Sequence, residues 1–281
     1  MKLYQPSVLR SLMESYDLKA LKGLGQNFLT DKNIIDNIIS KSLIDESDLV
    51  IEIGPGLGAL TQELLHKAGH VIAVEIDKKL IPVLRDVFKD TDNLTLVNRD
   101  IMKLDIGELI REEGRGLKSV KVVANLPYYI TSPLVMKLLE EYKGFSLLTL
   151  MMQKEVAERI TAPPSSKARG AISVAVEYYA EALIIMDVSK EVFYPKPKVD
   201  SCVVMLKPRE YPSKVGDEEL LFKLIKAAFQ MRRKTLLNAL SNIEGLEKGR
   251  IVEALLKVDV NPERRGETLS LEEFIKIANS L

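Results

Sequence analysis

The sequence contains 281 residues, 46% of them apolar and 28% charged, which is typical of a globular protein and excludes a disordered chain. Its 40 Lys and Arg residues balance 40 Asp and Glu residues, so the net charge gives no evidence for a polyanionic partner. The single cysteine excludes an intramolecular disulfide and a Cys-based metal site, and no metal is expected.

The N-terminal region is predicted to be a short amphipathic helix, with an apolar face made of Val8, Leu9, Leu12, Met13 and Tyr16. It has no continuous apolar core of the signal-peptide type. No segment reaches the roughly 18 apolar residues that a membrane-spanning helix needs. We therefore expect a cytoplasmic protein with no membrane partner.

From about residue 50, short β-rich runs alternate with helical patterns. Strands are predicted at 49–53, 70–76, 94–97, 119–124 and 145–152, and helices at 57–67, 79–88, 133–141 and 154–160. The run 172–179 is predicted to be extended. Strand-helix alternation of this kind predicts an α/β domain with a mainly parallel sheet and helices on both faces.

The pattern changes after about residue 187. A Pro-rich stretch at 193–198 cannot form a regular helix, and a strand follows it to Leu206. Helical patterns then cover 217–242, 245–257 and 270–280 without further alternation. We expect a first domain over residues 1–209 and a small, mostly helical domain over 210–281.

A glycine-rich turn follows the first strand of the alternating region. Gly54, Gly56 and Gly58 come directly after Glu52-Ile53 and before a helix, where glycine permits a sharp turn and the helix offers unpaired N–H groups. The same spacing also satisfies a dinucleotide-binding fingerprint. The turn alone therefore leaves the cofactor undecided.

Acidic residues follow the next two strands. Glu75 can accept hydrogen bonds from the ribose hydroxyls of an adenosine-containing cofactor, and Asp100 one from its adenine amine. A solvated strand-end acid and a helix N-cap are the respective structural alternatives. The functional interpretation is favoured because Glu52, Glu75 and Asp100 recur at successive strand ends.

The segment Asn125-Leu126-Pro127-Tyr128 favours one chemistry. An adenine amine is a poor nucleophile because its lone pair is delocalised, and the Asn125 amide and the Leu126 carbonyl are placed to accept its N–H bonds. Pro127 fixes the backbone, and Tyr128 offers a face for stacking a flipped base. Attack on a sulfonium methyl would then be promoted by positioning and electrostatics. A dehydrogenase has no use for this tetrad.

With these features the sequence resembles the bacterial small-subunit (16S) rRNA adenine dimethyltransferases, from about Leu24 to Leu281. The resemblance also rests on the motifs at 25–29, 153–159, 193–201 and 229–235. It implies a Rossmann-like class I methyltransferase fold and S-adenosylmethionine as cofactor. It further implies dimethylation of two adjacent adenosines near the 3′ end of small-subunit rRNA, within a late pre-30S particle. A monomer is expected.

The resemblance implies roles for individual residues. Asn125 would bridge cofactor and target base, and Tyr128 would stack on that base. Glu75 would bind the ribose and Asp100 the adenine. The full set expected to bind the cofactor is Gln26, Asn27, Leu29, Glu52, Gly54, Gly56, Gly58, Glu75, Ile76, Asp100, Ile101 and Asn125.

Basic residues cluster locally despite the zero net charge. Residues 220–243 contain five basic side chains and no acids. The predicted RNA-binding set is Lys196, Lys198, Lys223, Lys226, Arg232, Arg233 and Lys234. The loop 162–167 is interpreted as a mobile lid. The sequence departs from the family at Arg169, where an aromatic residue is expected before Gly170.

Three alternatives stay open. A large-subunit rRNA methyltransferase of the macrolide-resistance type would share the fold, although the block at 193–201 argues against it. A ribosome assembly factor with secondary methylation would also retain the cofactor pocket. An NAD-dependent dehydrogenase is the most distant alternative, because no acid-base constellation accompanies the glycine-rich turn.

Overall fold

The computed structural model describes residues 1–114, 116–210 and 213–281. The chain divides into two compact units. Unit 1 comprises residues 1–157 and 183–208, and unit 2 comprises residues 158–182 and 209–281. The expected boundary at 209/210 lies beside the second junction. Residues 158–182, which the sequence patterns assign to the first domain, instead group with the helical unit.

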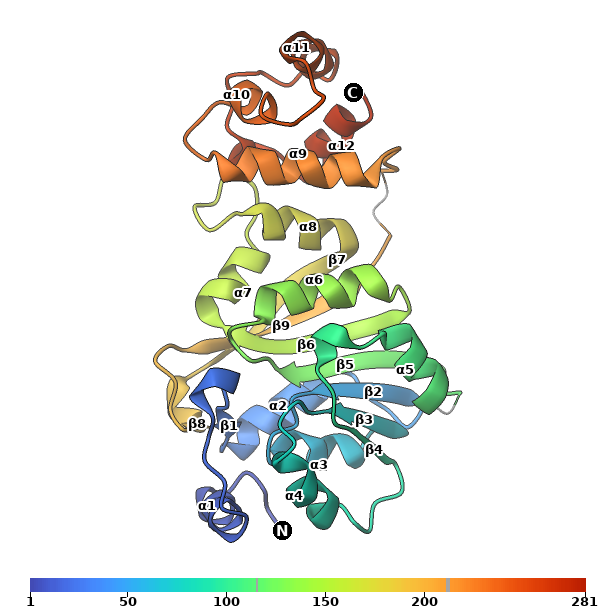
Figure 1. Cartoon of the computed structure of the whole chain (residues 1–281), viewed down its shortest axis with the longest axis vertical. Helices are drawn as coiled ribbons and strands as arrows, with labels where there is room; N and C mark the ends of the chain where they lie inside the picture. The colour runs from blue at the N-terminus through green and yellow to red at the C-terminus, as the bar shows by residue number, and fades with distance from the viewer. Residues whose placement is uncertain (115, 211–212) are drawn as a thin grey trace. The chain divides into compact units, whose positions relative to one another are not determined.

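A seven-stranded sheet with the order β4-β3-β2-β5-β6-β9-β7 organises the described part of unit 1 (Figure 1). Its strands are β2 (Asp48–Ile53), β3 (His70–Val74), β4 (Leu94–Val97), β5 (Ser119–Asn125), β6 (Phe145–Gln153), β7 (Ala180–Val188) and β9 (Ser201–Pro208). Neighbouring strands from β4 to β6 pair in parallel, and β9 pairs antiparallel with β6. The predicted mainly parallel α/β sheet is confirmed.

Helices and a small sheet complete unit 1. The helices are α1 (Pro6–Ser15), η1 (Lys22–Leu24), α2 (Lys32–Lys41), α3 (Ala59–Leu65), α4 (Leu80–Val87), η2 (Ile101–Lys103), α5 (Ile106–Glu113), α6 (Thr131–Glu141) and η3 (Lys190–Val192). Strands β1 (Phe28–Leu29) and β8 (Phe193–Tyr194) pair antiparallel. Every residue of β2 and β3 is buried, which explains their nearly continuous apolar sequence.

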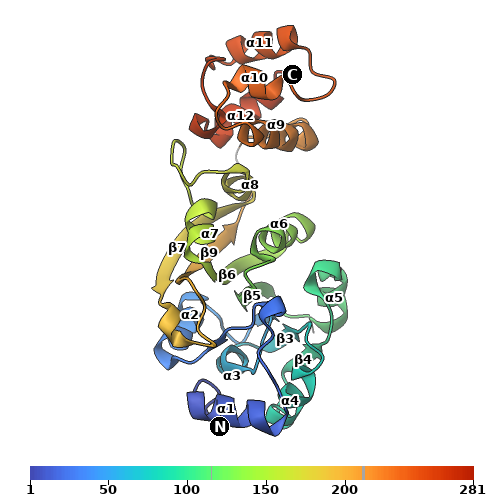
Figure 2. The ribbon, with the colours of Figure 1, turned by 60° about the vertical axis from the view of Figure 1, so that its left-hand side comes forward.

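Unit 2 is helical around its own core. Helix α7 (Lys154–Ile160) leads into it, and its helices are α8 (Ala171–Tyr179), α9 (Glu218–Gln230), α10 (Leu236–Leu240), α11 (Lys248–Lys257), η4 (Gly266–Thr268) and α12 (Leu271–Ala278). Figure 2 shows α9 to α12 gathered into one group. Val174 of α8 is buried in the same apolar cluster as Leu224 and Phe274. The predicted helical C-terminal part is therefore present.

Two expected elements differ in the structure. Residues 172–179 form α8 and not an extended segment, because Val174 and Val176 are buried within a helix and tertiary packing outweighs the β propensity of Val and Tyr. The pattern at 217–242 is interrupted between α9 and α10. There Thr235 caps α10 by accepting a hydrogen bond from the Asn238 N–H. No helix within the described ranges is long and apolar enough to cross a membrane.

Candidate active site

The carboxyl ends of four parallel strands meet at one edge of the sheet. In register, Ile53 of β2 lies beside Val74 of β3 and Ala124 of β5, and Val74 lies beside Val97 of β4. The residues that follow these strands therefore come together in space. This edge, where ligands bind in open α/β sheets, is the site that the sequence predicts.

The glycine-rich turn between β2 and α3 adopts conformations that suit glycine. Gly54, Gly56 and Gly58 have φ angles of 70°, 61° and 86°. A Cβ atom on Gly56 would lie 2.9 Å from the Phe28 ring, and one on Gly58 would lie 2.6 Å from the Phe88 ring. The turn is thus packed between two aromatic rings, and its backbone borders the pocket directly.

Glu52 and Glu75 are almost fully buried beside this turn. The Glu75 carboxylate accepts hydrogen bonds from the Gly56 N–H at 3.2 Å and the Asp77 N–H at 2.8 Å. The Glu52 Oε2 atom has no hydrogen-bond partner among the described residues. Burial raises the pKa of Glu52 to about 8 and that of Glu75 to about 7. Both carboxyls are suited to a ligand that brings hydrogen-bond donors or positive charge.

The segment after β5 is held by fixed contacts. The Asn125 Nδ2 atom donates to the Asn27 carbonyl at 2.9 Å, which leaves its Oδ1 atom available as an acceptor. The Leu126 N–H donates to the Met151 carbonyl at 2.9 Å. The Tyr128 and Ser201 hydroxyls are hydrogen-bonded at 2.9 Å. Three separate elements therefore orient this short segment.

A segment from the N-terminal region borders the same pocket. Phe28 and Leu29 pair with β8, and the Thr30 N–H donates to the Val192 carbonyl at 2.9 Å. The Gln26 side chain donates to Asp77 at 2.9 Å. Because Gln26, Asn27 and Leu29 all line the pocket, this segment is placed to cover a bound cofactor.

The pocket at the strand ends holds about 970 Å³ of empty space, part of it open to solvent. All the predicted cofactor-binding residues except Gly58 line it, as does Pro127. Gly58, Leu126 and Tyr128 are not among the described residues of the lining. That these residues bind a cofactor or substrate stays a prediction.

Several residues of the lining were not predicted from the sequence, among them Leu3, Leu9 and Tyr129. Leu3 and Leu9 come from the N-terminal region, whose apolar pattern indicates burial but not what it is buried against. Tyr129 lines the pocket with 53% of its surface exposed. The signal for Tyr129 in the sequence is its position directly after the Asn125–Tyr128 segment.

The predicted RNA-binding residues are divided between the units. Lys196 and Lys198 lie in unit 1, and the other five lie in unit 2 on or just after α9. All seven are exposed. Three of them form ion pairs: Lys196 with Glu191, Lys223 with Glu219, and Arg232 with Glu267.

The pocket residues fit S-adenosylmethionine. The unpartnered, buried Glu52 oxygen offers an acceptor for a cationic or hydroxyl-bearing group, and Glu75 and Asp100 offer further carboxylates at neighbouring strand ends. The glycine-rich turn brings the backbone to the pocket wall without side chains. This lining, rich in acceptors, matches the amine, hydroxyl and sulfonium groups of that cofactor.

Comparisons with known proteins identify the family of the chain. The family model for ribosomal RNA adenine dimethylase matches residues 18–281. The chain is 46% identical over 282 residues to a ribosomal RNA small subunit methyltransferase A of Alkaliphilus oremlandii, covering 100% of this chain and 98% of that protein.

Two solved structures share the fold. A dimethyladenosine transferase from Plasmodium falciparum aligns with a TM-score of 0.76 and 28% identity, covering 89% of this chain and 95% of that one. The 23S rRNA methyltransferase ErmE aligns with a TM-score of 0.69 and 25% identity, covering 91% and 99%.

The comparisons confirm the predicted Rossmann-like methyltransferase fold, the enzyme class and S-adenosylmethionine as methyl donor. The match extends over nearly the whole chain, including the helical unit. The chain therefore belongs to the ribosomal RNA adenine dimethylase family.

Proposed function

We propose that this chain dimethylates the N6 amines of two adjacent adenosines near the 3′ end of 16S rRNA, within a pre-30S particle. Its relatives are named ribosomal RNA small subunit methyltransferase A. The chain matches them over nearly their full length. The observation that carries the proposal is the Asn125–Tyr128 segment, fixed at the end of β5 beside the acidic pocket. The proposed substrate implies a cytoplasmic enzyme, and we expect it to act as a monomer.

The chain's own residues would act mainly by positioning. S-adenosylmethionine, when bound, supplies an electrophilic methyl group. The Asn125 Oδ1 atom and the Leu126 carbonyl are proposed to accept the two N–H bonds of the target amine, which favours a pyramidal nitrogen. Tyr128 is proposed to stack on the flipped base, with its ring oriented by the Ser201 hydrogen bond. No side-chain base is required, because the nitrogen loses its proton readily once it is methylated.

Unit 2 is proposed to supply much of the RNA contact. Lys226, Arg233 and Lys234 are exposed on or just after α9, in a stretch that has no acids between residues 220 and 243. Such a cluster neutralises phosphates and positions a folded RNA without reading its bases. Lys196 and Lys198 of unit 1 are proposed to add phosphate contacts beside the Pro-rich segment.

The test is methyl transfer to purified ribosomal subunits from a strain that lacks this modification. Radioactive S-adenosylmethionine should label small subunits and leave large subunits unlabelled. The Asn125→Ala variant should lose the activity while it unfolds at nearly the wild-type temperature. Preferential labelling of large subunits, or full activity of Asn125→Ala, would refute the proposed substrate or site respectively.

A further inference from the structure

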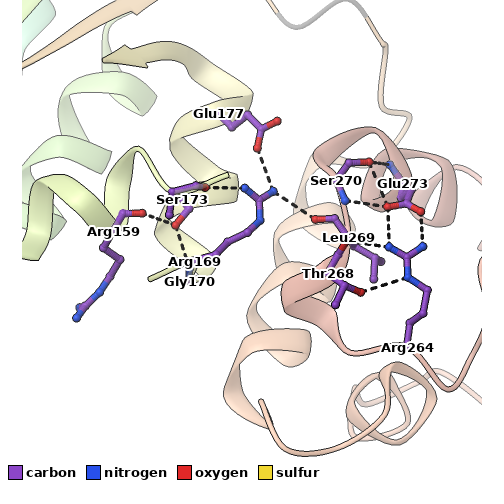
Figure 3. Close-up of polar contacts among 11 residues, drawn as sticks. Arg159, Arg169, Gly170, Ser173, Glu177, Arg264, Thr268, Leu269, Ser270 and Glu273 are labelled. Carbon is purple, nitrogen blue, oxygen red and sulfur yellow. Dashed lines mark hydrogen bonds and ion pairs between the residues drawn. The ribbon is translucent and has the colours of Figure 1, made fainter. Parts of the chain in front are cut away.

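A single buried arginine holds together three segments of unit 2 (Figure 3). Arg169 is only 1% exposed. Its Nη1 atom donates to the Ala162 carbonyl at 2.9 Å, and its Nη2 atom donates to the Glu177 carboxylate at 3.0 Å and the Leu269 carbonyl at 3.3 Å. The guanidinium thus joins the loop after α7, helix α8 and the segment that precedes α12.

The tip of the loop is tethered separately. The Ser165 N–H donates to the Glu267 carbonyl at 3.0 Å. The Arg232 guanidinium donates to the Lys167 carbonyl at 3.0 Å and to the Glu267 carboxylate at 3.2 Å. Ser165 is held at a φ of 67°, an uncommon conformation for serine. These contacts favour a loop held in place over the mobile lid that the sequence suggests for residues 162–167.

The segment before α12, to which Arg169 donates a hydrogen bond, is held in place by further contacts. Arg264 forms an ion pair with Glu273 and donates to the Thr268 carbonyl at 2.8 Å, and Glu273 in turn caps α12 with Ser270 (Figure 3). Gly266 packs so closely on α9 that a Cβ atom there would lie 2.6 Å from the Ala228 Cβ. The Leu269 carbonyl therefore has a defined position from which to hold the guanidinium.

Stability alone does not account for a buried arginine at this position. Its Nε atom has no hydrogen-bond partner among the described residues, and a buried ion pair is weak evidence for stability because the cost of desolvating its charges offsets their attraction. The three acceptors instead allow the Arg169 guanidinium to position the loop. They fix both ends of the loop and thereby the backbone at Lys167.

Two basic segments that are distant in sequence meet at this loop. The Lys167 backbone is bonded to Arg232, the first of the three consecutive basic residues 232–234. The Lys167 side chain is exposed, as are those of Arg233 and Lys234. A fixed loop that presents an ammonium group beside a basic tripeptide is suited to contact RNA phosphates without an ordering cost on binding.

We propose that Arg169 is a positioning residue that holds the loop 162–168 as a fixed part of the RNA-binding surface, with Lys167 as a phosphate contact beside residues 232–234. The inference rests on the proposed function, because it assumes that this unit binds the rRNA. The partner it specifies is the phosphate backbone of a folded RNA.

The test compares Arg169→Met, which keeps much of the volume but loses the donors, with Lys167→Ala, which leaves the network intact. Lys257→Ala, a change at an exposed lysine on α11, is the matched control. Each protein is assayed for kcat and for KM with undermethylated small subunits at several salt concentrations. Hydrogen exchange of the loop amides and cofactor affinity are measured in parallel.

Arg169→Met should accelerate hydrogen exchange at the backbone amides of residues 165 and 169. It should also raise KM by roughly fivefold to tenfold, with kcat nearly unchanged. Lys167→Ala should raise KM similarly and lower the salt slope by about 1, with exchange unchanged. Cofactor affinity and the Lys257→Ala control should match the wild type. A wild-type KM in Lys167→Ala, or unchanged exchange in Arg169→Met, would overturn the inference.

If Arg169→Met does not fold, Lys167→Ala still tests the phosphate contact, and Arg232→Met tests the tether of the loop tip by the same exchange measurement. A wild-type KM in Lys167→Ala would then overturn the inference, and loop protection that persists in Arg232→Met would show that the Arg169 network holds the loop without the tether at its tip. Failure of the proposed function has a different signature, because the wild-type protein itself would not methylate small subunits.

Discussion

Glu52→Gln should stabilise the cofactor-free protein at neutral pH. The Glu52 carboxyl is buried, one of its oxygens is unpartnered, and burial raises its pKa to about 8. In the unfolded chain the pKa of the same carboxyl returns to its ordinary value of 4.5. At about 1.4 kcal/mol per pH unit, keeping it protonated at pH 7 costs about 3 kcal/mol of the free energy of unfolding.

The sign follows from proton linkage. A carboxyl whose pKa is raised in the folded state holds its proton in that state, so its contribution to stability is lost as pH rises from about 4.5 through 8. Glu52→Gln removes this titration. The difference in free energy of unfolding between variant and wild type should therefore grow in the variant's favour between pH 5 and pH 8.

Urea denaturation without cofactor at pH 5, 6, 7 and 8 measures this difference. Glu46→Gln, a change at an exposed glutamate, is the control and should show a constant difference. The same Glu52→Gln protein should bind S-adenosylmethionine more weakly, because an amide, unlike the Glu52 carboxyl, cannot ionise against the positive charge of the cofactor. A pH-independent difference for Glu52→Gln would refute the reasoning from burial.

Three further predictions concern the same unit. Burial raises the pKa of Glu75 to about 7, so in a Glu52→Gln background cofactor affinity should rise roughly tenfold between pH 6 and 8 as Glu75 ionises. A flat profile in calorimetric titration would contradict its role as an acceptor. Tyr128→Phe should retain methylation within a few-fold whereas Tyr128→Ala should lose about a hundredfold in kcat/KM, and equal losses would show that the hydroxyl and not the ring matters. Gly58→Ala should lower the free energy of unfolding by about 2 kcal/mol because of its positive φ and the clash with Phe88, and an unchanged thermal midpoint would contradict this.

The sequence is most informative where strands and helices alternate along the chain. It is least informative where tertiary packing decides the secondary structure. Parallel strands with acids at their ends predict that Glu52, Glu75 and Asp100 converge, because strand ends of one direction share a sheet edge, and the structure brings them together. The glycine spacing predicts the turn between β2 and α3 in the same way. These features are local or follow from topology.

Helix α8 and the hydrogen bonds of Arg169 could not be predicted from such local patterns. The run 171–179 is rich in Val and Tyr, and only its burial against the helical core makes it a helix. An arginine in a loop predicts exposure by default, yet Arg169 finds acceptors on Glu177 and Leu269, which are 8 and 100 residues away. Such partners are visible only after folding.

Mapping the modified nucleotides tests the central claim most directly. Undermethylated small subunits are treated with the purified protein and S-adenosylmethionine, and methylated adenines are located by primer extension and mass spectrometry of the 16S rRNA. We expect dimethylation of two adjacent adenosines near the 3′ end, and none with Asn125→Ala. Methyl groups at other nucleotides, or on a ring nitrogen in place of the N6 amine, would contradict the claim.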